Sequence, residues 1–364
     1  MNTLVKAAGK IKIIPGLLKD IYEELRFFFK ELKVSVYRIE GTTPFQDKLT
    51  IYHISRKRIP EYFLAKFYAE LPSVEIESRI YLWQIPGRVK MIEKKTGLLF
   101  VRTHAFLKYI LRDGFIAIPE YIKQILDVKG DEKEIKKNFH KGLKKTELRR
   151  IRKYGYSYEI STDPEKVEFF YQRMYIPFTS KRHQEYAHLD SLEIVQEETT
   201  AGIMFLKKDN QCIGGASMRK KADTLFVKKF GFIDADDMFY KHSILGALYY
   251  FIITFAKEEG YKKVDLGFTP PILSDGILIF KNKWGSKMKH VWGESSIFLL
   301  KICQPNDSLK KILADNPLIT IGGGKLVGCA FSHSEYISKL DRLNIKISPD
   351  YFNGLDAVKV VNLN

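Results

Sequence analysis

The chain has 364 residues, 45% of them hydrophobic, and carries a formal net charge of +17. This length predicts two domains, or one domain with a substantial appendage, and the 25 Phe and 20 Tyr residues suffice for a large core, which excludes global disorder. The positive charge indicates a polyanionic partner: a nucleic acid, an anionic membrane surface or a phosphate-bearing cofactor.

The cysteines and the apolar runs bear on the cellular location of the protein and on whether it crosses a membrane. Cys212, Cys303 and Cys329 are odd in number and too widely spaced for a zinc knuckle, so we expect no disulfide framework and a cytoplasmic location. The longest apolar run, Ile244 to Ala256, is shorter than the ~20 residues that cross a bilayer. No group of residues has metal-ligand spacing, so we expect no metal. A soluble or peripheral protein is predicted.

The N-terminal third is predicted to be α+β and carries no chemical motif. Residues 16–33 place apolar side chains at helical spacing, which fits a helix on a membrane surface or one packed on the protein's own core. Short β-rich runs over 49–54, 79–85 and 98–102 alternate with helical segments. Both interpretations of residues 16–33 stay open.

Residues 133–153 contain ten Lys or Arg and two Glu, with an apolar side at roughly helical spacing. Such a basic helix suits a nucleic-acid backbone or a phosphorylated ligand, and it is equally compatible with an ordinary solvated face.

The elements become more distinct from Tyr156 onward. A strand over 156–161 precedes a helix that Asp163 caps and Pro164 opens. A hairpin turns at Asp209-Asn210, and a further strand begins at Thr224. The helix Ser243–Glu259 ends at Gly260 and leads into the buried strand 261–267. The predicted class is α/β (α+β) with a central mixed sheet.

Residues from about Phe139 to Glu294 resemble the GNAT superfamily of acyltransferases, specifically its FemAB-like and BioF2-like branch. Three segments carry the resemblance: 148–155, Gly246 with 256–267, and 276–285 with its Phe280-Lys281 pair. The resemblance implies a GNAT fold over residues 131–300. It also implies that residues 1–130 form a reduced first copy of that fold, and we expect 301–364 to be a C-terminal appendage.

In such folds two central strands splay apart and the acyl donor lies in the gap. The next helix then turns its N-terminus toward the donor's phosphates. For this chain the resemblance assigns donor binding to Phe230, Lys241, His242, Ser243 and Gly246, with Ser243 as N-cap. The glycine-rich acetyl-CoA signature of the superfamily is absent, and the FemAB-like branch uses aminoacyl-tRNA as its donor. Two donors are therefore expected as alternatives: acyl-CoA (acetyl-CoA) and aminoacyl-tRNA.

Transfer of an acyl group to an amine needs proton removal, oxyanion stabilisation and positioning. Lys281, after a strand-like run over 276–280, is expected to stabilise the oxyanion, while Asp265 or Asp275 serves as base; the alternatives are a surface lysine and turn-capping carboxylates. Four residues are expected to bind the acceptor: Arg182, His183, Phe280 and Trp284.

The function predicted from these features is N-acyl or aminoacyl transfer from a phosphate-bearing donor to an unidentified amine, by direct nucleophilic attack. Two alternatives from other classes remain: a basic nucleic-acid-binding protein, and a scaffold at the membrane periphery.

Overall fold

The computed structural model describes residues 32–103, 111, 114–183, 189–235, 243–290, 296–333 and 337–363. The amphipathic segment 16–33 therefore lies almost entirely outside the described residues. Among the helices described, none is long and apolar enough to cross a membrane.

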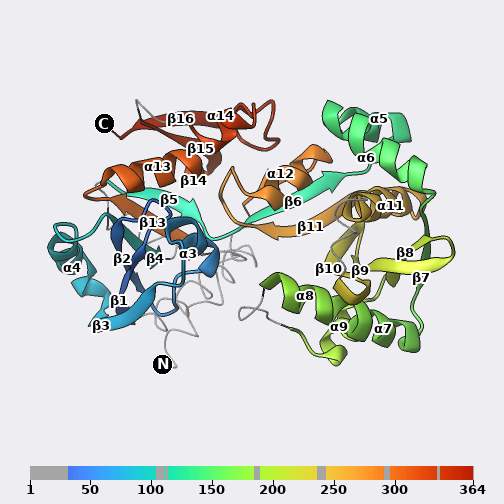
Figure 1. The fold of residues 1–364 in the computed structure, drawn as a ribbon, viewed down its shortest axis with the longest axis horizontal. Coiled ribbons are helices and arrows are strands. Elements are labelled where there is room, and N and C mark those ends of the chain that lie inside the picture. Colours follow the sequence, from blue (N-terminus) through green and yellow to red (C-terminus); the bar gives the residue numbers. More distant parts are fainter. Residues whose placement is uncertain are drawn as a thin grey trace, which may run out of the picture.

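Two mixed sheets form the two halves of the molecule (Figure 1). The six-stranded sheet has the order β3 (Ser73–Tyr81), β1 (Lys33–Thr42), β2 (Lys48–Ser55), β4 (Leu98–Thr103), β13 (Ile297–Ile302), β5 (Ile116–Pro119). The seven-stranded sheet has the order β12 (Lys287–Lys289), β6 (Ile122–Asp127), β11 (Lys263–Thr269), β10 (Thr224–Phe232), β9 (Gln211–Lys221), β8 (Ile203–Lys208), β7 (Ser157–Ser161). The predicted α/β class with a central mixed sheet is confirmed.

A three-stranded sheet lies beside the first half (Figure 1). It consists of β14 (Leu318–Gly322), β15 (Lys325–Ser332) and β16 (Ala357–Asn362). Helices α3 (Glu61–Phe67), α4 (Ile85–Ile92), α13 (Asp307–Asp315) and α14 (Lys339–Arg342) accompany these two sheets. Apolar side chains of β15 and α13 share one core with the six-stranded sheet, so the tail packs back on the first half.

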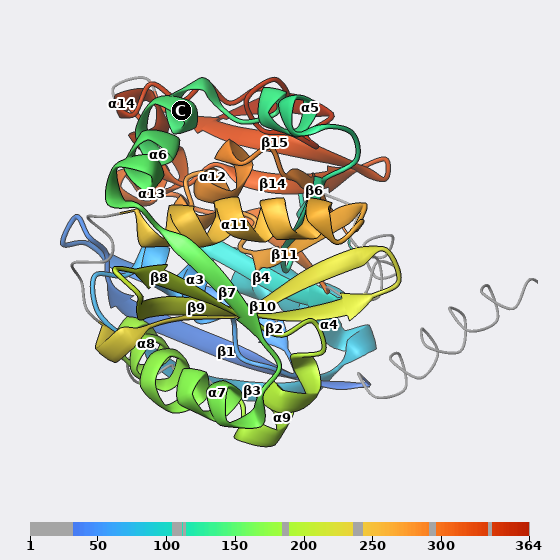
Figure 2. The ribbon, with the colours of Figure 1, turned by 90° about the vertical axis from the view of Figure 1, so that its right-hand side faces the viewer.

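Helices cover both faces of the seven-stranded sheet (Figure 2). One face carries α11 (Ile244–Glu258), and the opposite face carries α7 (Pro164–Phe170), α8 (Ile176–His183) and α9 (Leu192–Glu198). A π-helical turn, Tyr171–Tyr175, joins α7 to α8. The main core lies between the sheet and α11, because the face of α11 that packs on the strands is apolar.

The two large sheets share one pattern of strand directions. In each, a parallel pair (β2 with β4, β10 with β11) is flanked by antiparallel neighbours. The halves also exchange strands: β6 follows β5 in the chain but pairs in the seven-stranded sheet, and β13 pairs in the six-stranded one. The sheets thus exchange at residues near 120 and 297. The division at 130 and 300, with a reduced first copy, stays a prediction.

Several local predictions are confirmed, and three are wrong. Asp163 caps α7 through the Glu165 amide, and the hairpin turns at Asp209-Asn210, both at positive φ. The strand predicted over 79–85 ends at Tyr81 and becomes a 3₁₀ turn. The basic segment forms two helices, α5 (Glu132–Lys137) and α6 (Lys141–Tyr154), because Asp131 and His140 each start a new one.

The third correction concerns residues 276–280, which were predicted to be strand-like. They lie in the helix α12 (Gly276–Lys283), because the Asp275 carboxylate accepts hydrogen bonds from the amides of Ile277 and Leu278 and so caps a first helical turn. The short apolar run could not distinguish a strand from a buried helix.

Candidate functional site

The central strands β10 and β11 separate after a short parallel contact. Their paired residues end at Phe226 and Asp265, although both strands continue for several residues beyond that point. Bulges between Val227 and Lys229 and between Asp265 and Phe268 redirect the two strands. Gly267 has φ +76, a conformation that a side chain would strain. The splayed strands that the resemblance implied are present.

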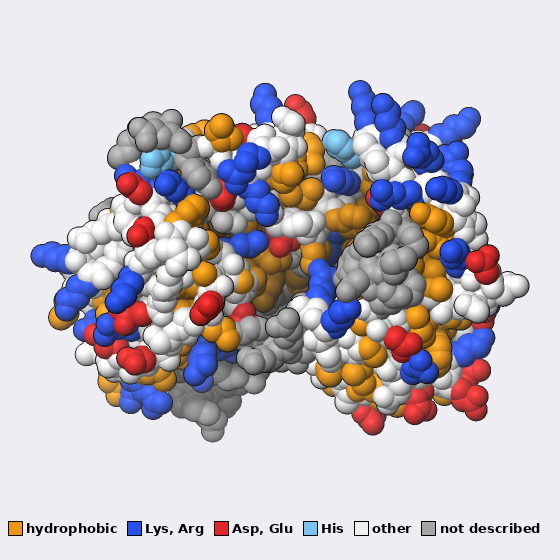
Figure 3. Space-filling view, viewed as in Figure 1, with side chains coloured by type: hydrophobic (Ala, Val, Ile, Leu, Met, Phe, Trp, Pro, Cys, Tyr) orange, Lys and Arg blue, Asp and Glu red, His pale blue; other side chains and the backbone are white. Residues whose placement is uncertain are grey.

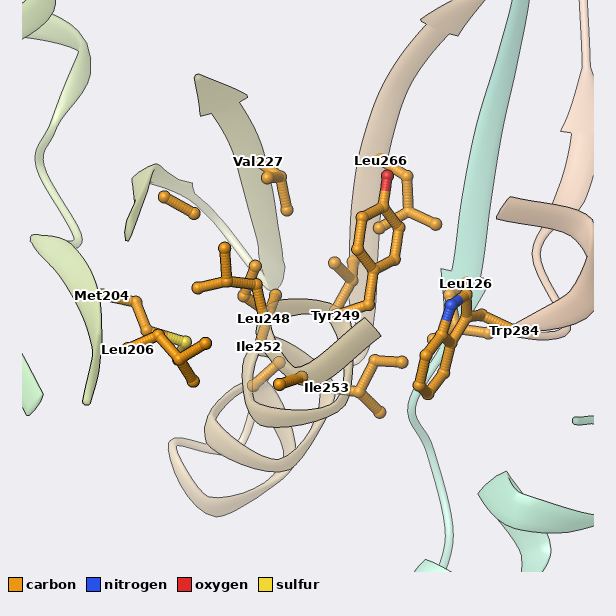
Figure 4. Packing of buried hydrophobic residues seen from close by; sticks show 14 of the residues in the cluster. Leu126, Met204, Leu206, Val227, Leu248, Tyr249, Ile252, Ile253, Leu266 and Trp284 are labelled. Carbon is orange, nitrogen blue, oxygen red and sulfur yellow. The ribbon is translucent and has the colours of Figure 1, made fainter. Parts of the chain in front are cut away.

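Tyr249 of α11 projects toward the gap between these strands. Figure 4 shows its ring between Val227 of β10 and Leu266 of β11. The ring is stacked on Phe230 with centroids 5.4 Å apart, and it meets Phe280 edge-on at 5.2 Å. The residue is 3% exposed, and its hydroxyl has no hydrogen bond to any described residue. Sequence reasoning missed Tyr249, because its position in an apolar helix looks like an ordinary core position.

Lys281 is buried at the end of β11, where its surroundings are mostly apolar. Its side chain comes from α12, is 5% exposed, and donates to the Phe268 carbonyl oxygen at 3.2 Å. Burial lowers its pKa from the ordinary value to about 8, while the nearby carboxylates of Asp265 and Asp275 oppose that shift. At neutral pH the group is therefore a buried ammonium that gives up its proton readily.

The two candidate bases, Asp265 and Asp275, differ in their ion-pair and hydrogen-bond partners. Asp265 is 3% exposed, pairs with the Lys123 ammonium at 3.1 Å and accepts from the Gly267 amide at 2.8 Å. Asp275 caps α12 through two amides and so holds the helix that carries Lys281. Lys123 was not predicted, because β6 lies far from β11 in the sequence and only the strand exchange brings them together.

The predicted acceptor residues fall into two groups. Arg182 lies in the last turn of α8, and its charge adds to the lowering of the Lys281 pKa that burial causes and opposes the raising of the Tyr249 pKa that burial causes. Phe280 and Trp284 belong to the aromatic cluster around Tyr249, and Trp284 is fully buried, which leaves it no surface for an acceptor in this structure. The side chain of His183 lies outside the described residues.

The predicted phosphate site at the start of α11 is only partly described. Lys241 and His242 lie outside the described residues. Ser243 is the N-cap residue of α11, as predicted, but its hydroxyl makes no bond to the first turn and accepts instead from Arg150 at 3.1 Å. A side chain at Gly246 would collide with the Glu147 carboxylate, 2.4 Å from its Cβ position. Helix α6 therefore covers this end of α11 with one cation and one anion.

Two clefts adjoin the splayed strands. One of about 730 Å³ is lined by α3, Tyr121 and Arg182, and Figure 3 shows the molecule hollowed between its halves. The other, of about 420 Å³, is lined by residues of β6, β9, β10 and β11. The rings of Tyr121 and Phe268, one from each cleft, have centroids 6.1 Å apart.

Among the described residues, no group of three His, Cys, Asp or Glu side chains is arranged to hold a metal ion. The three cysteines form no disulfide.

Comparisons with known proteins give similar folds and no sequence relative. No protein-family model matches the chain, and no match was found among curated proteins. The chain is similar to the structure titled "Crystal structure of FemX" (14% identity, 73% of this chain and 83% of that one, TM-score 0.40). It is also similar to L-PGS from Bacillus licheniformis (12%, 74% and 85%, TM-score 0.35). A third similar structure is a GCN5-related N-acetyltransferase from Sphaerobacter thermophilus (11%, 78% and 86%, TM-score 0.36).

At such TM-scores and identities none of these structures determines an activity for this chain.

The buried Lys281 should destabilise the fold at neutral pH. Its folded-state pKa of about 8 lies below the ordinary value of 10.5, so the unfolded chain binds more protons between these pH values. Stability should therefore rise with pH across this window. Lys281→Met should abolish that rise and add on the order of 1–3 kcal/mol at pH 7. Urea unfolding at pH 7 and 10 measures both effects; an unchanged pH dependence in the variant would contradict the assignment.

Tyr249→Phe removes only the hydroxyl at the gap. Because that hydroxyl has no described partner, the variant should melt at the wild-type temperature or above it, whereas loss of a satisfied hydrogen bond costs about 1 kcal/mol. Tyr250→Phe is the matched control on the same helix, where the hydroxyl interacts with Glu132 and Lys136 instead. Calorimetry of the three proteins decides; a clearly lower melting temperature for Tyr249→Phe alone would show a structural role.

Proposed function

We propose that this chain is an N-acyltransferase that moves an acyl or aminoacyl group from a phosphate-bearing donor to an amine. The observation that carries the proposal is the Lys281 ammonium, buried where β10 and β11 diverge. A buried charge costs stability, and an apolar residue would fit α12 at a lower cost. A lysine at this position has a function if a bound ligand develops negative charge during the reaction, because the ammonium then stabilises that charge.

The reaction needs little more than positioning and charge. The acceptor nitrogen attacks the donor carbonyl carbon, the N–C bond forms, and negative charge develops on the carbonyl oxygen. Lys281 stabilises that oxygen from the end of β11, inside a site of low dielectric constant. The C–S or C–O bond to the leaving group then breaks, and the proton of the amine ends on the leaving sulfur or oxygen.

The remaining groups are assigned by their contacts. Tyr249 donates a hydrogen bond into the gap, since burial raises the pKa of its phenol and keeps it protonated. Asp265 and Asp275 both stay candidate bases: Lys123 and the Gly267 amide engage the two oxygens of Asp265, and Asp275 caps α12 through one of its oxygens. The cleft with Arg182 at its wall is the candidate entrance for the acceptor.

Two donor classes are compatible with this site: an acyl-CoA and an aminoacyl-tRNA. The exposed side of α6 bears on the choice, because its apolar residues Leu143, Leu148 and Ile151 are buried while its cations face solvent. Figure 3 shows Lys and Arg gathered above α5 and α6. A basic face of this size suits the backbone of a large polyanion, and an acyl-CoA would use little of it.

Transfer should depend on Lys281 and on its protonation. A thermal-shift screen of acetyl-CoA, longer acyl-CoAs and alanyl-tRNA identifies a donor, since a bound donor stabilises the fold. With that donor, Lys281→Ala should reduce the rate about 10²–10³-fold. Lys283→Ala, on the same helix, should leave the rate unchanged. The wild-type rate should fall as the pH rises through about 8, because the Lys281 ammonium loses its proton and its charge. A fully active Lys281→Ala enzyme would refute the proposal.

The salt dependence of donor binding separates the two donor classes. If the donor is an aminoacyl-tRNA, its affinity should fall steeply with salt, and the charge reversal Arg149→Glu/Lys153→Glu should weaken binding about tenfold or more. If it is an acyl-CoA, the same variant should bind as the wild type does. RNA binding with a steep salt slope, without any acyl transfer, would support the rival interpretation as a nucleic-acid-binding protein.

A further inference from the structure

The cleft of about 420 Å³ beside the splayed strands is lined largely by cations, and it is called the basic cleft below. It lies on the face of the sheet away from α11: Phe226 and Asp265 line it, while their strand neighbours Leu225 and Val264 pack in the core with α11. The cations that line it are Lys123, Arg219, Lys221, Lys228 and Lys229.

The carboxylates in contact with these cations do not balance them. Asp265 pairs with Lys123 at 3.1 Å, Glu198 with Lys228 at 2.7 Å and with Arg219 at 4.0 Å, and Asp190 pairs with Lys229. Among the described residues, these five cations pair with three carboxylates. Lys221 is exposed and forms no ion pair with a described residue, so it is available to a ligand.

The floor of the basic cleft is partly aromatic. The Lys123 ammonium lies 5.7 Å from the ring centroid of Phe226 and 5.3 Å from that of Phe268, and the Arg219 guanidinium lies 5.3 Å from that of Phe226. These contacts hold the cations in place along the wall, so less side-chain entropy is lost when a ligand binds. The Phe268 ring is 43% exposed and offers an apolar surface to the body of the ligand.

The basic cleft and the proposed reaction centre share two residues. Phe268 presents its ring to the cleft and its carbonyl oxygen to Lys281, and Asp265 lines the cleft and acts on the pKa of Lys281. The basic cleft and Lys281 therefore meet at the same two residues of β11.

From this geometry we infer that the basic cleft binds the anionic part of the acceptor. The acceptor class is an amine that carries two or more phosphate or carboxylate charges beside an apolar body. The role of this ligand as the acceptor rests on the proposed function. The anion site itself can be tested without any turnover.

Calorimetric titration at low ionic strength tests the site, with inorganic pyrophosphate and citrate as probes for phosphates and carboxylates. The variant Lys221→Gln/Lys228→Gln keeps polar side chains and removes two charges. It should lose about tenfold or more in affinity for the preferred probe. The control Lys325→Gln/Lys346→Gln removes the same charge from the three-stranded sheet and its neighbouring loop, and should bind as the wild type does.

A third variant, Arg150→Ala, separates this cleft from the start of α11. Probe binding that survives in Lys221→Gln/Lys228→Gln, or that is lost only in Arg150→Ala, would overturn the inference. Probe binding that depends on Lys221 and Lys228 in a protein that transfers no acyl group would support the anion site and refute the proposed function alone. In an active enzyme, the cleft variant should raise KM for the anionic acceptor and leave kcat unchanged.

Discussion

The loss of pairing between β10 and β11 is the constraint on which the proposed site depends. Adjacent parallel strands normally keep their ladder to the end, because an unpaired backbone group in the interior costs about 1–3 kcal/mol. Here the ladder stops after three pairs. Bulges on both strands and the positive φ of Gly267 make the divergence a built feature of the backbone. Tyr249, Lys281 and the basic cleft all take their positions from it.

The same region concentrates the electrostatic cost of the fold. Lys281 is a buried ammonium that donates to one carbonyl oxygen and has two carboxylates nearby. The neighbouring residue Phe280 packs with Tyr249 and Phe230 in one aromatic cluster, and a charge that develops in a setting of low polarity interacts strongly with other charges. A site that is strained in its free form, and relieved when negative charge appears, is typical of enzymes that stabilise an oxyanion.

The sequence predicted best where a residue acts on its own neighbours. Asp163 before Pro164, the Asp209-Asn210 turn and Gly260 at positive φ are local signals, and each appears in the structure where it was expected. Prediction failed where a run was too short to show a period, as at 276–280, and where one residue interrupts a helix, as at His140. The burial of Lys281 could be suspected only from the resemblance.

Contacts between distant segments were beyond the sequence. The Lys123–Asp265 ion pair exists because β6 crosses from the first half into the seven-stranded sheet, and nothing in residues 122–127 indicates that crossing. The basic cleft likewise draws on four strands, each of which carries lysines that look like ordinary surface residues when read singly. Tyr249 differs from its helical neighbours only in pointing toward a gap that the strand pairing reveals.

The most direct test of the account is a crystal structure with an unreactive analogue of the donor that raises the melting temperature. The account predicts the acyl carbonyl oxygen between β10 and β11, within hydrogen-bonding distance of Lys281 Nζ, and the Tyr249 hydroxyl bonded to the ligand. A donor bound elsewhere, with Lys281 still bonded only to the Phe268 carbonyl oxygen, would contradict it.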